Sequence, residues 1–419
     1  MSNLPDSAKL NNLGQLEIGG CSCTDLAQKF GTPLYVIDEI TLRNRCRDYI
    51  QLFQKFHPKT EIAFASKALC TTAIAKIVAS EGLGIDVSSG GEIYTAQKAG
   101  CDLKKAYFHG NNKPAEEIKF ALKVGVGRFV IDNLDELNRL DKVAKEMNKT
   151  AEILIRINPG IEAHTHEYIK TGTTDSKFGV PQNEIDAVVK EAKSRSNIKI
   201  VGLHAHIGSQ IFDVQPFVDE TKLLLELVDK FELTELDLGG GIGIPYLESE
   251  VAPDLEDFAR RITAVLQGRK DIKLILEPGR SIVGQAGVTL YTIGGIKEIP
   301  SIRKYVFIDG GMSDNPRPIL YQAKYAAAIA NRANLPKTET VTVAGRFCES
   351  GDILIRDINL QPITVGDILA VFCTGAYNYA MASNYNRVGR PAMVMVNNGK
   401  ATIIVKRESY EDLTRNDQI

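Results

Sequence analysis

The sequence has no strong excess of one charge, no long hydrophobic run and few cysteines. Its 419 residues include 50 Lys and Arg against 52 Asp and Glu, for a formal net charge of −2. This balance does not favour a basic surface for nucleic acids or anionic membranes. No apolar run approaches the roughly 18–20 residues of a membrane-spanning helix, and residues 1–12 lack the basic and apolar parts of a secretory signal. We therefore expect a cytoplasmic protein.

The seven cysteines are too few in a chain of this length to indicate a disulfide framework. No CxxC pair is present, which fits a reducing compartment. Cys21 and Cys23 form a CxC pair, but no second pair follows at a spacing suited to a zinc site. We predict no metal site at this pair, and none elsewhere in the chain.

What the chain does contain is a regular alternation of short apolar runs with stretches of helical patterning. The eight runs are Ile62–Ala65, Gly84–Val87, Ala106–His109, Arg128–Ile131, Ile153–Ile157, Ile200–His204, Glu235–Leu238 and Leu274–Leu276. After the first run, Ala73, Ile74, Ile77 and Val78 form an apolar stripe typical of a helix packed on a sheet. The alternation predicts an α/β fold, a TIM-type (β/α)8 barrel over residues 39–282, with its active site at the carboxyl ends of the strands.

A second, β-rich domain is predicted from the sequence after the barrel. There, short β-like runs are separated by Gly, Pro, Asn and Asp. These runs are Val283, Val288–Ile293, Lys304–Ile308, Glu339–Val343, Ile353–Ile355, Ile368–Phe372, Ala392–Val396 and Thr402–Val405. Thr32–Asp38 also alternates apolar and polar residues, and it has no place in the barrel. We therefore assign residues 1–38 together with 283–419 to an all-β domain that takes one N-terminal strand.

Lys67 is the first candidate for chemistry, because it follows the first apolar run and is surrounded by small, neutral residues. Partial desolvation there would lower the pKa of its ammonium group. The resulting neutral amine could form a Schiff base with an aldehyde. On this segment alone, a solvated lysine at a strand end remains the alternative.

Two glycine-containing turns predict an anion site. Gly239–Gly243 follows the seventh apolar run, and Glu277–Arg280 follows the eighth. Barrels commonly bind phosphate with the loops after strands seven and eight, where glycines let backbone N–H groups approach the anion. One glycine run alone would indicate only a turn, whereas two at these positions indicate a phosphate site.

Glu277 and two histidines leave alternatives open. A carboxylate at a buried strand end needs a donor, which could be the pyridine nitrogen of pyridoxal phosphate or a structural arginine. His204 and His206 lie two apart on a strand, so they point to the same face. They could bind a metal, although further ligands would be needed. Alternatively, a histidine could stack on an aromatic cofactor while Ser209 donates to its phosphate.

Eleven ordered segments between Thr32 and Val396 carry a family resemblance. They are FASKAL (64–69), GIDVSSGGE (84–92), FHGNNK (108–113), RINPG (156–160), SKFG (176–179), HAHIGSQ (204–210), DLGGGIG (237–243), EPGRSIV (277–283), RPILY (317–321), CESGD (348–352) and GAYNYAMASNYN (375–386). The chain resembles the alanine-racemase-type barrel decarboxylases that use pyridoxal phosphate, and most closely the diaminopimelate decarboxylases. Together the segments are far more specific than any one of them.

The resemblance implies a set of residues that hold pyridoxal 5'-phosphate. Lys67 would bind the cofactor covalently, His206 would stack on its pyridine ring, and Glu277 would pair with the ring nitrogen. Asp86 also belongs to the implied cofactor site. The residues implied to bind the phosphate are Ser209, Gly240, Gly241, Gly279, Arg280 and Tyr377.

The resemblance also implies how the substrate is bound and protonated. Cys348 would donate the proton after decarboxylation, which makes it catalytic together with Lys67 and Glu277. In this family the CES segment reaches the active site of the partner subunit, so a homodimer with shared sites is expected. The residues implied to bind the substrate are Arg280, Arg317, Tyr321, Glu349 and Tyr377.

Two positions depart from the family pattern. Arg346 lies in Gly345-Arg346-Phe347, where a Gly-Pro is usual ahead of the CES segment, and Leu69 ends FASKAL where Asn is common. Neither position is implied to bond to cofactor or substrate, so the departures concern the detail of the loops.

Charge favours one substrate within the family. A distal group with both an ammonium and a carboxylate needs a mixed pocket, in which Arg280 and Arg317 take the carboxylate and Glu349 takes the ammonium. We therefore expect decarboxylation of meso-2,6-diaminopimelate to L-lysine and CO2, the last step of lysine biosynthesis. The alternative is a related decarboxylase acting on ornithine, arginine or a carboxylated polyamine, whose pocket would need acidic residues alone. A racemase would need a second base, and a non-catalytic regulator would not be expected to keep the catalytic residues.

Overall fold

The computed structural model describes residues 3–161 and 176–419, and the chain divides into two compact units. The barrel unit comprises Arg45–Gly243 and Ala252–Ser281. The β unit comprises Met1–Asn44, Ile244–Val251 and Ile282–Ile419. Ile244–Val251 thus belongs to the β unit, although it directly follows the glycine run after the seventh barrel strand. Among the helices of the described residues, none is both long and apolar enough to cross a membrane.

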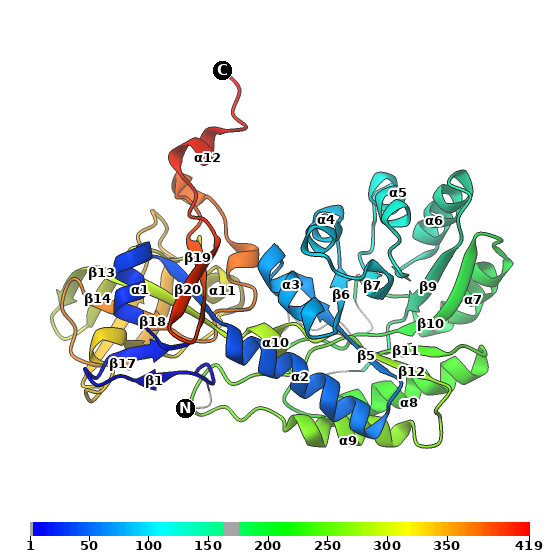
Figure 1. Ribbon diagram of the computed structural model, residues 1–419, viewed down its shortest axis with the longest axis horizontal. Coiled ribbons are helices and arrows are strands. Elements are labelled where there is room, and N and C mark those ends of the chain that lie inside the picture. Colours follow the sequence, from blue (N-terminus) through cyan, green and yellow to red (C-terminus); the bar gives the residue numbers. More distant parts are fainter. Residues whose placement is uncertain (1–2, 162–175) are drawn as a thin grey trace. The chain divides into compact units, whose positions relative to one another are not determined.

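The barrel unit contains a closed barrel of eight parallel strands (Figure 1). The strands are β5 (Thr60–Ala65), β6 (Gly84–Val87), β7 (Ala106–Phe108), β8 (Arg128–Ile131), β9 (Ala151–Arg156), β10 (Ile198–His204), β11 (Glu235–Asp237) and β12 (Lys273–Leu276). Each one coincides with a predicted apolar run, because strands buried on both faces have nearly continuous apolar sequences. β12 pairs with β5 and closes the barrel. The predicted TIM-type barrel is confirmed.

Helices alternate with the strands in sequence, beginning with one before β5, as the blue-to-green ribbons of Figure 1 show. They are α2 (Glu39–Phe56), α3 (Thr72–Ser80), α4 (Gly90–Ala99), α5 (Ala115–Val124), α6 (Leu134–Glu146), α7 (Ile185–Ser194), α8 (Gln215–Lys230) and α9 (Leu255–Val265). In α3, Ile74, Ile77 and Val78 of the predicted stripe are buried. Side-chain caps define several helix starts, since Ser89 and Asn133 accept N–H groups of the first turns of α4 and α6.

Side chains fill the barrel interior in layers, as is usual for this fold. The middle layer is apolar and consists of Ala63, Tyr107, Val130, Leu154, Val201 and Ile275. At the amino ends of the strands the residues are charged. There, Arg128 forms a bidentate pair with Glu235 (2.8 and 2.6 Å) and donates to Glu152 at 2.5 Å. At the carboxyl ends lies a second polar layer, which forms the candidate site described below.

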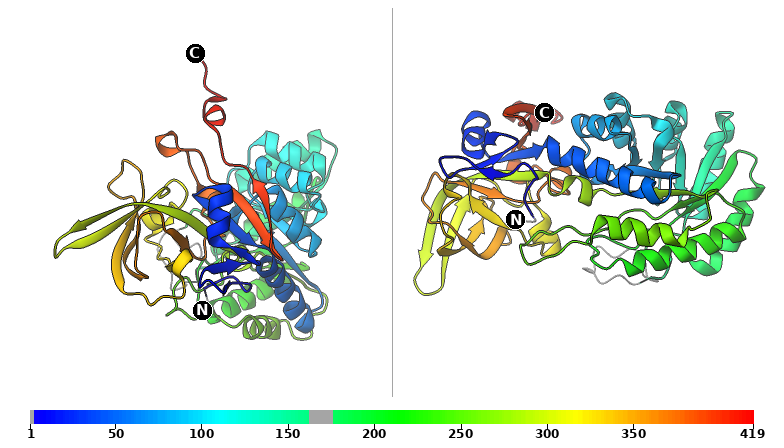
Figure 2. Two further views of the ribbon diagram at one scale, coloured as in Figure 1. Left: turned by 60° about the vertical axis from the view of Figure 1, so that its left-hand side comes forward. Right: turned by 60° about the horizontal axis from the view of Figure 1, so that its bottom comes forward.

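β4 (Leu34–Asp38), which lies within the predicted N-terminal strand segment, is a central strand of the β unit. It pairs antiparallel with β13 (Gly287–Ile299) and parallel with β19 (Ala392–Asn397). Figure 2 shows this blue N-terminal segment among yellow, orange and red C-terminal strands. All five residues of β4 are buried, because strands flank it on both sides and cores cover the sheet. The β unit is therefore built from both ends of the chain.

The main sheet of the β unit has the order β17-β16-β14-β13-β4-β19-β20, and β18 joins β13 and β15. The further strands are β14 (Arg303–Ile308), β15 (Ala327–Ile329), β16 (Glu339–Ala344), β17 (Ile353–Leu360), β18 (Ile368–Val371) and β20 (Lys400–Val405). β15 was not predicted, because its three residues are too short to give a pattern. Val283, predicted as β-like, instead ends the short helix α10 (Arg280–Val283), which continues directly from the Pro278-Gly279 turn.

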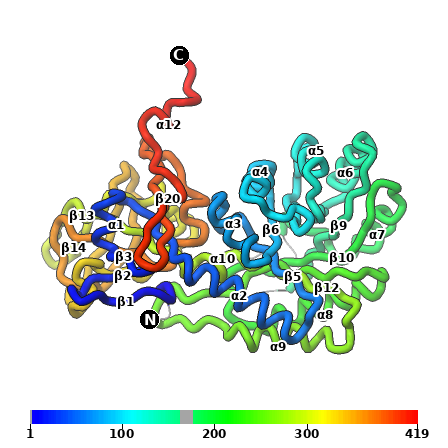
Figure 3. The backbone as a smooth tube through the Cα atoms, viewed as in Figure 1, coloured from blue at the N-terminus to red at the C-terminus, as the bar shows by residue number. Residues whose placement is uncertain are grey.

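Shorter elements complete the β unit. β1 (Lys9–Leu10), β2 (Leu16–Ile18) and β3 (Cys21–Ser22) form a small sheet, and the helices are α1 (Cys23–Phe30), α11 (Arg317–Tyr321) and α12 (Tyr410–Thr414). Gly399 N donates to Gly19 O at 2.7 Å, so the turn between β19 and β20 touches the turn between β2 and β3 (Figure 3). The polar C-terminal tail forms α12, which a capping box of Ser409 and Asp412 starts.

Candidate active site

The carboxyl-terminal layer of the barrel interior consists of polar residues that are at most 8% exposed. They are Asp86, His109, Asp132, Arg156, His204, Asp237 and Glu277. Each lies at or just after the end of a strand from β6 to β12, so closure of the barrel brings them together. Buried charges are costly unless they compensate one another, and such clusters are common at functional sites.

Lys67 lies directly after β5 in a single 3-10 turn, η1 (Ser66–Ala68). Its side chain is exposed, so the expectation of a desolvated lysine is wrong for this chain. The turn buries Ser66 and Ala68 and leaves the lysine between them towards solvent. Burial raises the pKa of Asp86 and lowers that of His206, and the charge of Lys67 opposes the first shift and adds to the second. Lys67 therefore lies close to both residues.

Glu277 is held from two sides. Its Oε1 accepts a hydrogen bond from His109 Nε2 at 2.7 Å, and its Oε2 lies 3.3 Å from His204 Nε2. Burial alone would raise the pKa of Glu277, but the charge and hydrogen bond of His109, together with His204, hold that pKa well below its usual range. Glu277 is therefore ionised, which is the state that can pair with a protonated ring nitrogen.

His204 is neutral and incompletely bonded. Burial lowers the pKa of His204 to about 3, and the charges of His109 and Arg156 add to the effect. Neither ring nitrogen has a hydrogen-bond partner of good geometry within the described residues. The ring meets that of His109 edge-on, with 4.9 Å between the centroids. His109 is thus the residue that donates to Glu277, and His204 fills the space beside it.

Two aspartates complete the environment of Glu277. Burial, with the charge of Glu277, raises the pKa of Asp86 to about 6, although His109 and Lys67 oppose the shift. Asp237 Oδ1 accepts from Gly239 N at 2.9 Å, while its Oδ2 has no hydrogen-bond partner within the described residues. Burial and the charge of Glu277 raise the pKa of Asp237 well above its usual range. Burial and the negative charge of Glu277 therefore disfavour the ionised form of Asp237, whereas the histidines favour that of Glu277.

Three of these side chains also have a spacing that metal ions use. Ligand atoms of His109, His204 and Glu277 lie within 4.8 Å of one another. The sequence suggested a metal pair of His204 and His206 without further ligands, whereas the fold places His109 and Glu277 beside His204. A cation at this position would occupy the carboxylate that a pyridine nitrogen needs, so the two ligands would exclude each other.

The two predicted glycine turns lie against each other, backbone to backbone. Glu277 N donates to Gly239 O at 2.7 Å. A Cβ on Gly240 would lie 2.2 Å from Glu277 O, and one on Gly241 would lie 2.2 Å from Gly208 O. A Cβ on Gly279 would lie 3.0 Å from Ala65 Cβ. Only glycine fits at Gly240 and Gly241, because the backbones of the neighbouring turns fill the space that a Cβ would occupy.

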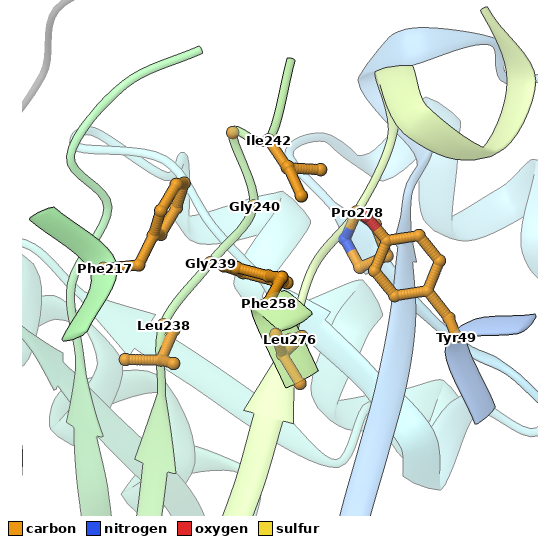
Figure 4. A pocket seen from close by; sticks show the side chains of 10 residues that line it. Tyr49, Phe217, Leu238, Gly239, Gly240, Ile242, Phe258, Leu276 and Pro278 are labelled. Atoms are coloured by element: carbon orange, nitrogen blue, oxygen red, sulfur yellow. The ribbon is translucent and has the colours of Figure 1, made fainter. Parts of the chain in front are cut away.

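An apolar pocket supports these turns from behind (Figure 4). Tyr49 from α2, Phe217 from α8 and Phe258 from α9 line it together with Leu238 and Pro278. Phe217 and Phe258 meet edge-on at 5.1 Å between centroids, and the hydroxyls of Tyr49 and Ser281 lie 2.7 Å apart. The packing fixes the glycine turns without supplying any charge.

Ser209 and Arg280, both implied phosphate ligands, are bonded to each other. Arg280 Nη2 donates to Ser209 Oγ at 2.8 Å, and Nε donates to the same oxygen at 3.3 Å. Gly208 precedes Ser209 and packs on Gly241, so the loop after β10 joins the two glycine turns. The structure therefore brings Ser209, Gly240, Gly241, Gly279 and Arg280 to one corner of the barrel mouth.

The loop after β9 is described only in part. Residues 163–166 of this loop lie outside the described residues. The guanidinium of Arg156 lies 4.4 Å from the ring centre of Phe178, within the SKFG segment. Gly179 is in the left-handed region, and a Cβ there would lie 2.8 Å from the backbone of Ile157. The far end of this loop is thus anchored on the end of β9.

The other predicted site residues belong to the β unit, where they come from neighbouring segments. Arg317 begins α11 and is 7% exposed. Its Nη1 donates to Tyr325 Oη at 2.6 Å, and its guanidinium lies over the ring of Tyr246 at 4.9 Å. No carboxylate pairs with Arg317 within residues 3–161 and 176–419, and its polar neighbours are the hydroxyls of Tyr246 and Tyr325. Tyr321 ends α11, and its side chain is partly exposed.

The CES segment is a tight loop between β16 and β17. Asp352 fixes it, since its carboxylate accepts from Met312 N (2.7 Å) and Phe347 N (2.9 Å). Cys348 and Glu349 are exposed on this loop. Gly351 lies against Ile319 of α11, where a Cβ would approach to 2.7 Å. Cys348 and Glu349 are therefore on a loop that packs beside the helix carrying Arg317 and Tyr321.

Tyr377 joins this region through its neighbour in sequence. The amide of Asn378 lies 3.4 Å from Tyr325 Oη, which also accepts from Arg317. Tyr377 has a φ of 63°, an uncommon conformation for a residue other than glycine. Such backbone strain is often found at functional sites. The β unit thus gathers all five of its predicted site residues on adjacent segments.

Sequence reasoning gave no specific role to three residues of these regions. His109 was noted at the end of an apolar run and within FHGNNK, Asp237 as the start of a glycine segment, and Asp352 as part of the CESGD segment. Their roles depend on partners that are distant in sequence; His109 and Glu277 are 168 positions apart. The departure at Arg346 leaves the loop intact, because Arg346 N donates to Gly310 O at 3.1 Å and the side chain is exposed.

The barrel mouth fits a phosphorylated pyridine. The glycine turns lie beside the hydroxyl of Ser209 and the guanidinium of Arg280, which suit a phosphate, and Glu277 is a buried carboxylate whose pKa His109 and His204 hold low. Burial lowers the pKa of His206 well below its usual range, so that its ring is neutral and suited to stacking on another ring.

Comparison with known proteins agrees with this chemistry. Residues 41–284 match the family model of the pyridoxal-binding domain of pyridoxal-dependent decarboxylases. A diaminopimelate decarboxylase of Synechocystis sp. is 49% identical over 99% of this chain and 92% of its own length. The chain belongs to the diaminopimelate decarboxylase family.

Other members of the diaminopimelate decarboxylase family support the assignment. The Bacillus subtilis enzyme is 46% identical over 99% of this chain and 98% of its own length. A diaminopimelate decarboxylase from M. jannaschii, solved in a complex with L-lysine, has a TM-score of 0.93 and 37% sequence identity. That structure covers 100% of this chain, and the match covers 99% of the M. jannaschii chain. The resemblance stated from sequence motifs is confirmed, as is pyridoxal phosphate as the cofactor of the family.

Proposed function

We propose that this chain decarboxylates meso-2,6-diaminopimelate to L-lysine and CO2, the last step of lysine biosynthesis. The observation that carries the proposal is the 49% identity over 99% of the chain to a relative named diaminopimelate decarboxylase. The structural relative solved with L-lysine is consistent with this product. The bond between one Cα and its carboxylate carbon breaks, and CO2 leaves. A proton then takes the position of the carboxylate on that Cα.

The barrel unit would hold the cofactor. Pyridoxal 5'-phosphate supplies an electron sink for the electron pair that remains when CO2 leaves. Lys67 would bind its aldehyde carbon, which requires the lysine to lose its proton. Glu277 would keep the ring nitrogen protonated, and His206 would stack on the ring near Asp86. Its phosphate would be held by Ser209, Gly240, Gly241, Gly279 and Arg280 of the barrel unit and by Tyr377 of the β unit.

The distal end of the substrate would be held by residues of both signs. Arg317 is suited to bind a carboxylate, because it is buried beside Tyr246 and Tyr325 and no described carboxylate pairs with it. The Arg280 side chain would share that carboxylate, with Tyr321 and Tyr377 beside it. Glu349 would bind the distal ammonium. A polyamine-type substrate has no distal carboxylate, so it would leave the buried Arg317 without a counterion.

Cys348 would donate the proton to Cα, since it is exposed on a loop that Asp352 fixes. We propose that it acts across a homodimer, so that each active site combines the barrel of one subunit with the CES segment of its partner. We also propose a cytoplasmic location. An exposed thiol donor remains reduced there.

Release of CO2 by purified protein with added pyridoxal phosphate tests the proposal. The substrates to compare are meso-diaminopimelate, ornithine, arginine and lysine. We expect release from diaminopimelate alone, with lysine as the product. Release from ornithine or arginine instead would overturn the roles of Arg317 and Glu349 while leaving the fold and cofactor assignments intact.

The shared active site has its own test. Lys67→Ala and Cys348→Ala proteins are each expected to be nearly inactive, because each lacks one half of the chemistry. Mixing the two under conditions that exchange subunits should restore part of the activity, since some dimers then contain one intact site. Restored activity would support a shared site, and no recovery despite proven exchange would contradict it.

A further inference from the structure

His109 lies where it can control the carboxylate that faces the cofactor ring. Its Nε2 is 2.7 Å from Glu277 Oε1 and 3.7 Å from Asp86 Oδ1. An ionised carboxylate can only accept, so His109 must donate to Glu277. The histidine is thus placed between two carboxylates that come from β6 and from the end of β12.

The backbone around His109 is firmly held. His109 N donates to Val87 O at 2.8 Å. Four residues further on, the loop is anchored by Lys113, whose Nζ donates to Gly110 O at 2.8 Å, Val130 O at 2.7 Å and Glu136 at 2.6 Å. Lys113 and Glu136 form a fully buried ion pair. This anchoring keeps the imidazole at a fixed distance from Glu277.

The other imidazole at Glu277 cannot take the same role. His204 lies 3.3 Å from Glu277 Oε2 but makes no hydrogen bond of good geometry within the described residues. Burial lowers the pKa of His204 to about 3, so its ring is neutral. The hydrogen bond that orients the Glu277 carboxylate therefore comes from His109.

We propose that His109 is a positioning residue, which keeps Glu277 ionised and fixes the orientation of its carboxylate towards the pyridine nitrogen. The proposal rests on the proposed function, in which Glu277 keeps that nitrogen protonated. His109 does not touch the reacting carbon and is not catalytic. Its effect reaches the cofactor through Glu277.

The charged surroundings of His109 define how pH should act. Asp86 of β6, His204 of β10 and Glu277 after β12 face the imidazole directly. Lys67 after β5 and Glu92 of α4 act on the neighbouring Asp86, and Asp237 of β11 acts on Glu277. Without the imidazole of His109, Glu277 would lose its hydrogen-bond donor at Oε1, and its tendency to take up a proton would rise.

The test uses His109→Gln, which keeps an N–H donor but cannot carry a charge. His57→Gln is the matched control, since His57 is also buried in the barrel unit and contacts Ile272 O at 2.9 Å, just before the amino ends of β5 and β12. Cofactor-free proteins are titrated with pyridoxal phosphate, and the absorbance of the bound cofactor is recorded between about pH 6 and 9. Thermal unfolding of each protein is measured in parallel.

We expect His109→Gln to weaken cofactor binding by about tenfold to a hundredfold, as for loss of a hydrogen bond to a charged group. The ring nitrogen of its bound cofactor should lose its proton at lower pH than in the wild type. His57→Gln should change neither property. kcat should fall with little change in KM, because substrate contacts are not altered.

Different results would overturn different claims. If His109→Gln matched His57→Gln in affinity and spectrum, His109 would have no positioning role. Parallel losses of affinity and melting temperature without a spectral pH shift would make it merely structural, which also overturns the proposal. If His109→Gln failed to fold, His109→Asn would be tested by the same criteria. Failure of the wild type to bind pyridoxal phosphate or to decarboxylate diaminopimelate would instead overturn the proposed function.

Discussion

The two ends of the barrel interior both contain charged residues, yet they differ in how those charges are satisfied. At the amino ends of the strands, Arg128 pairs with Glu235 and Glu152, and Lys273 pairs with Glu61 at 2.8 Å. Burial alone would lower the pKa of Arg128, but its two acidic partners raise it. The donors and acceptors of this end complement one another.

At the carboxyl ends, the same barrel holds groups that do not complement one another. Asp237 Oδ2 and both ring nitrogens of His204 have no hydrogen-bond partner within the described part of the chain. Burial and like charges raise the pKa values of Asp86 and Asp237, while Glu277 remains ionised. A protein keeps such unsatisfied groups where a ligand completes them. The charged residues at the amino ends of the strands therefore stabilise the barrel, whereas those at the carboxyl ends form a binding site.

The largest effect is expected at Glu277. Glu277→Gln removes the charge that holds the ring nitrogen protonated, and we expect kcat to fall by about 10³-fold, as for loss of a key electrostatic group. Glu235→Gln at the opposite end should leave kcat unchanged and lower the melting temperature. Near wild-type turnover of Glu277→Gln in the CO2 assay would mean that Glu277 has no role in the mechanism. The two ends of the barrel interior would then not differ in function at this residue.

Cys348→Ala tests whether chemistry extends beyond the barrel. Loss of a proton donor is expected to reduce turnover by about 10²- to 10³-fold, while cofactor affinity stays close to that of the wild type. The buried Cys373, whose Sγ contacts Asn3 O at 3.2 Å, provides a control in the same unit. Cys373→Ala should affect stability alone. Equal losses of turnover and cofactor binding in Cys348→Ala would show that Cys348 is structural.

Arg128→Met should remove the ion pairs at the amino ends of the barrel strands without lowering kcat. It leaves Glu235 and Glu152 without their shared cation, so the free energy of unfolding should fall by about 3 to 4 kcal/mol. Urea unfolding of the cofactor-free protein measures this change. At temperatures where the variant is folded, kcat should equal that of the wild type. A loss of kcat in the folded variant would mean that the two ends are coupled.

The pH dependence of stability should have opposite signs at the two ends. Burial raises the pKa of Asp86 to about 6, so in the cofactor-free protein its stabilising contribution is present below about pH 4 and is lost as pH rises to about 6. This loss corresponds to about 2 to 3 kcal/mol, and Asp86→Asn should abolish it. Glu152 has a lowered pKa because Lys199 and Arg128 outweigh burial, so its contribution is lost as pH falls. If the free energy of unfolding changed with pH by the same amount in the wild type and in Asp86→Asn over this range, the contrast would be refuted.

The smallest effect is expected at a capping residue near the site. Asn133 accepts from Glu136 N at 2.9 Å and donates to Asn111 O at 3.0 Å, at the carboxyl end of β8. Asn133→Ala should lower the free energy of unfolding by about 1 kcal/mol and leave kcat unchanged. A marked loss of kcat in this variant would show that the whole carboxyl face, rather than the buried layer alone, controls the chemistry.

The sequence alone determined the strands of the barrel and the residues that follow them. Strands buried on both faces need continuous apolar runs, so the eight runs could be read locally, and the motifs placed Lys67, Glu277 and the glycine turns at strand ends. The same local reasoning found the N-terminal strand of the β unit. It could not find β15, whose three residues carry no pattern, nor the helical end at Val283.

Only the tertiary structure decided which of these groups lie in contact and which of them are protonated. The pair of His109 and Glu277, like that of Arg128 and Glu235, joins residues more than a hundred positions apart. Closure of the barrel sets the burial of each charge, and burial together with neighbouring charges sets its protonation. That is why the sequence identified Glu277 but not its donor, and why Lys67, expected to be desolvated, is exposed. Local pattern fixes the strands, whereas pairing across the closed barrel creates the site.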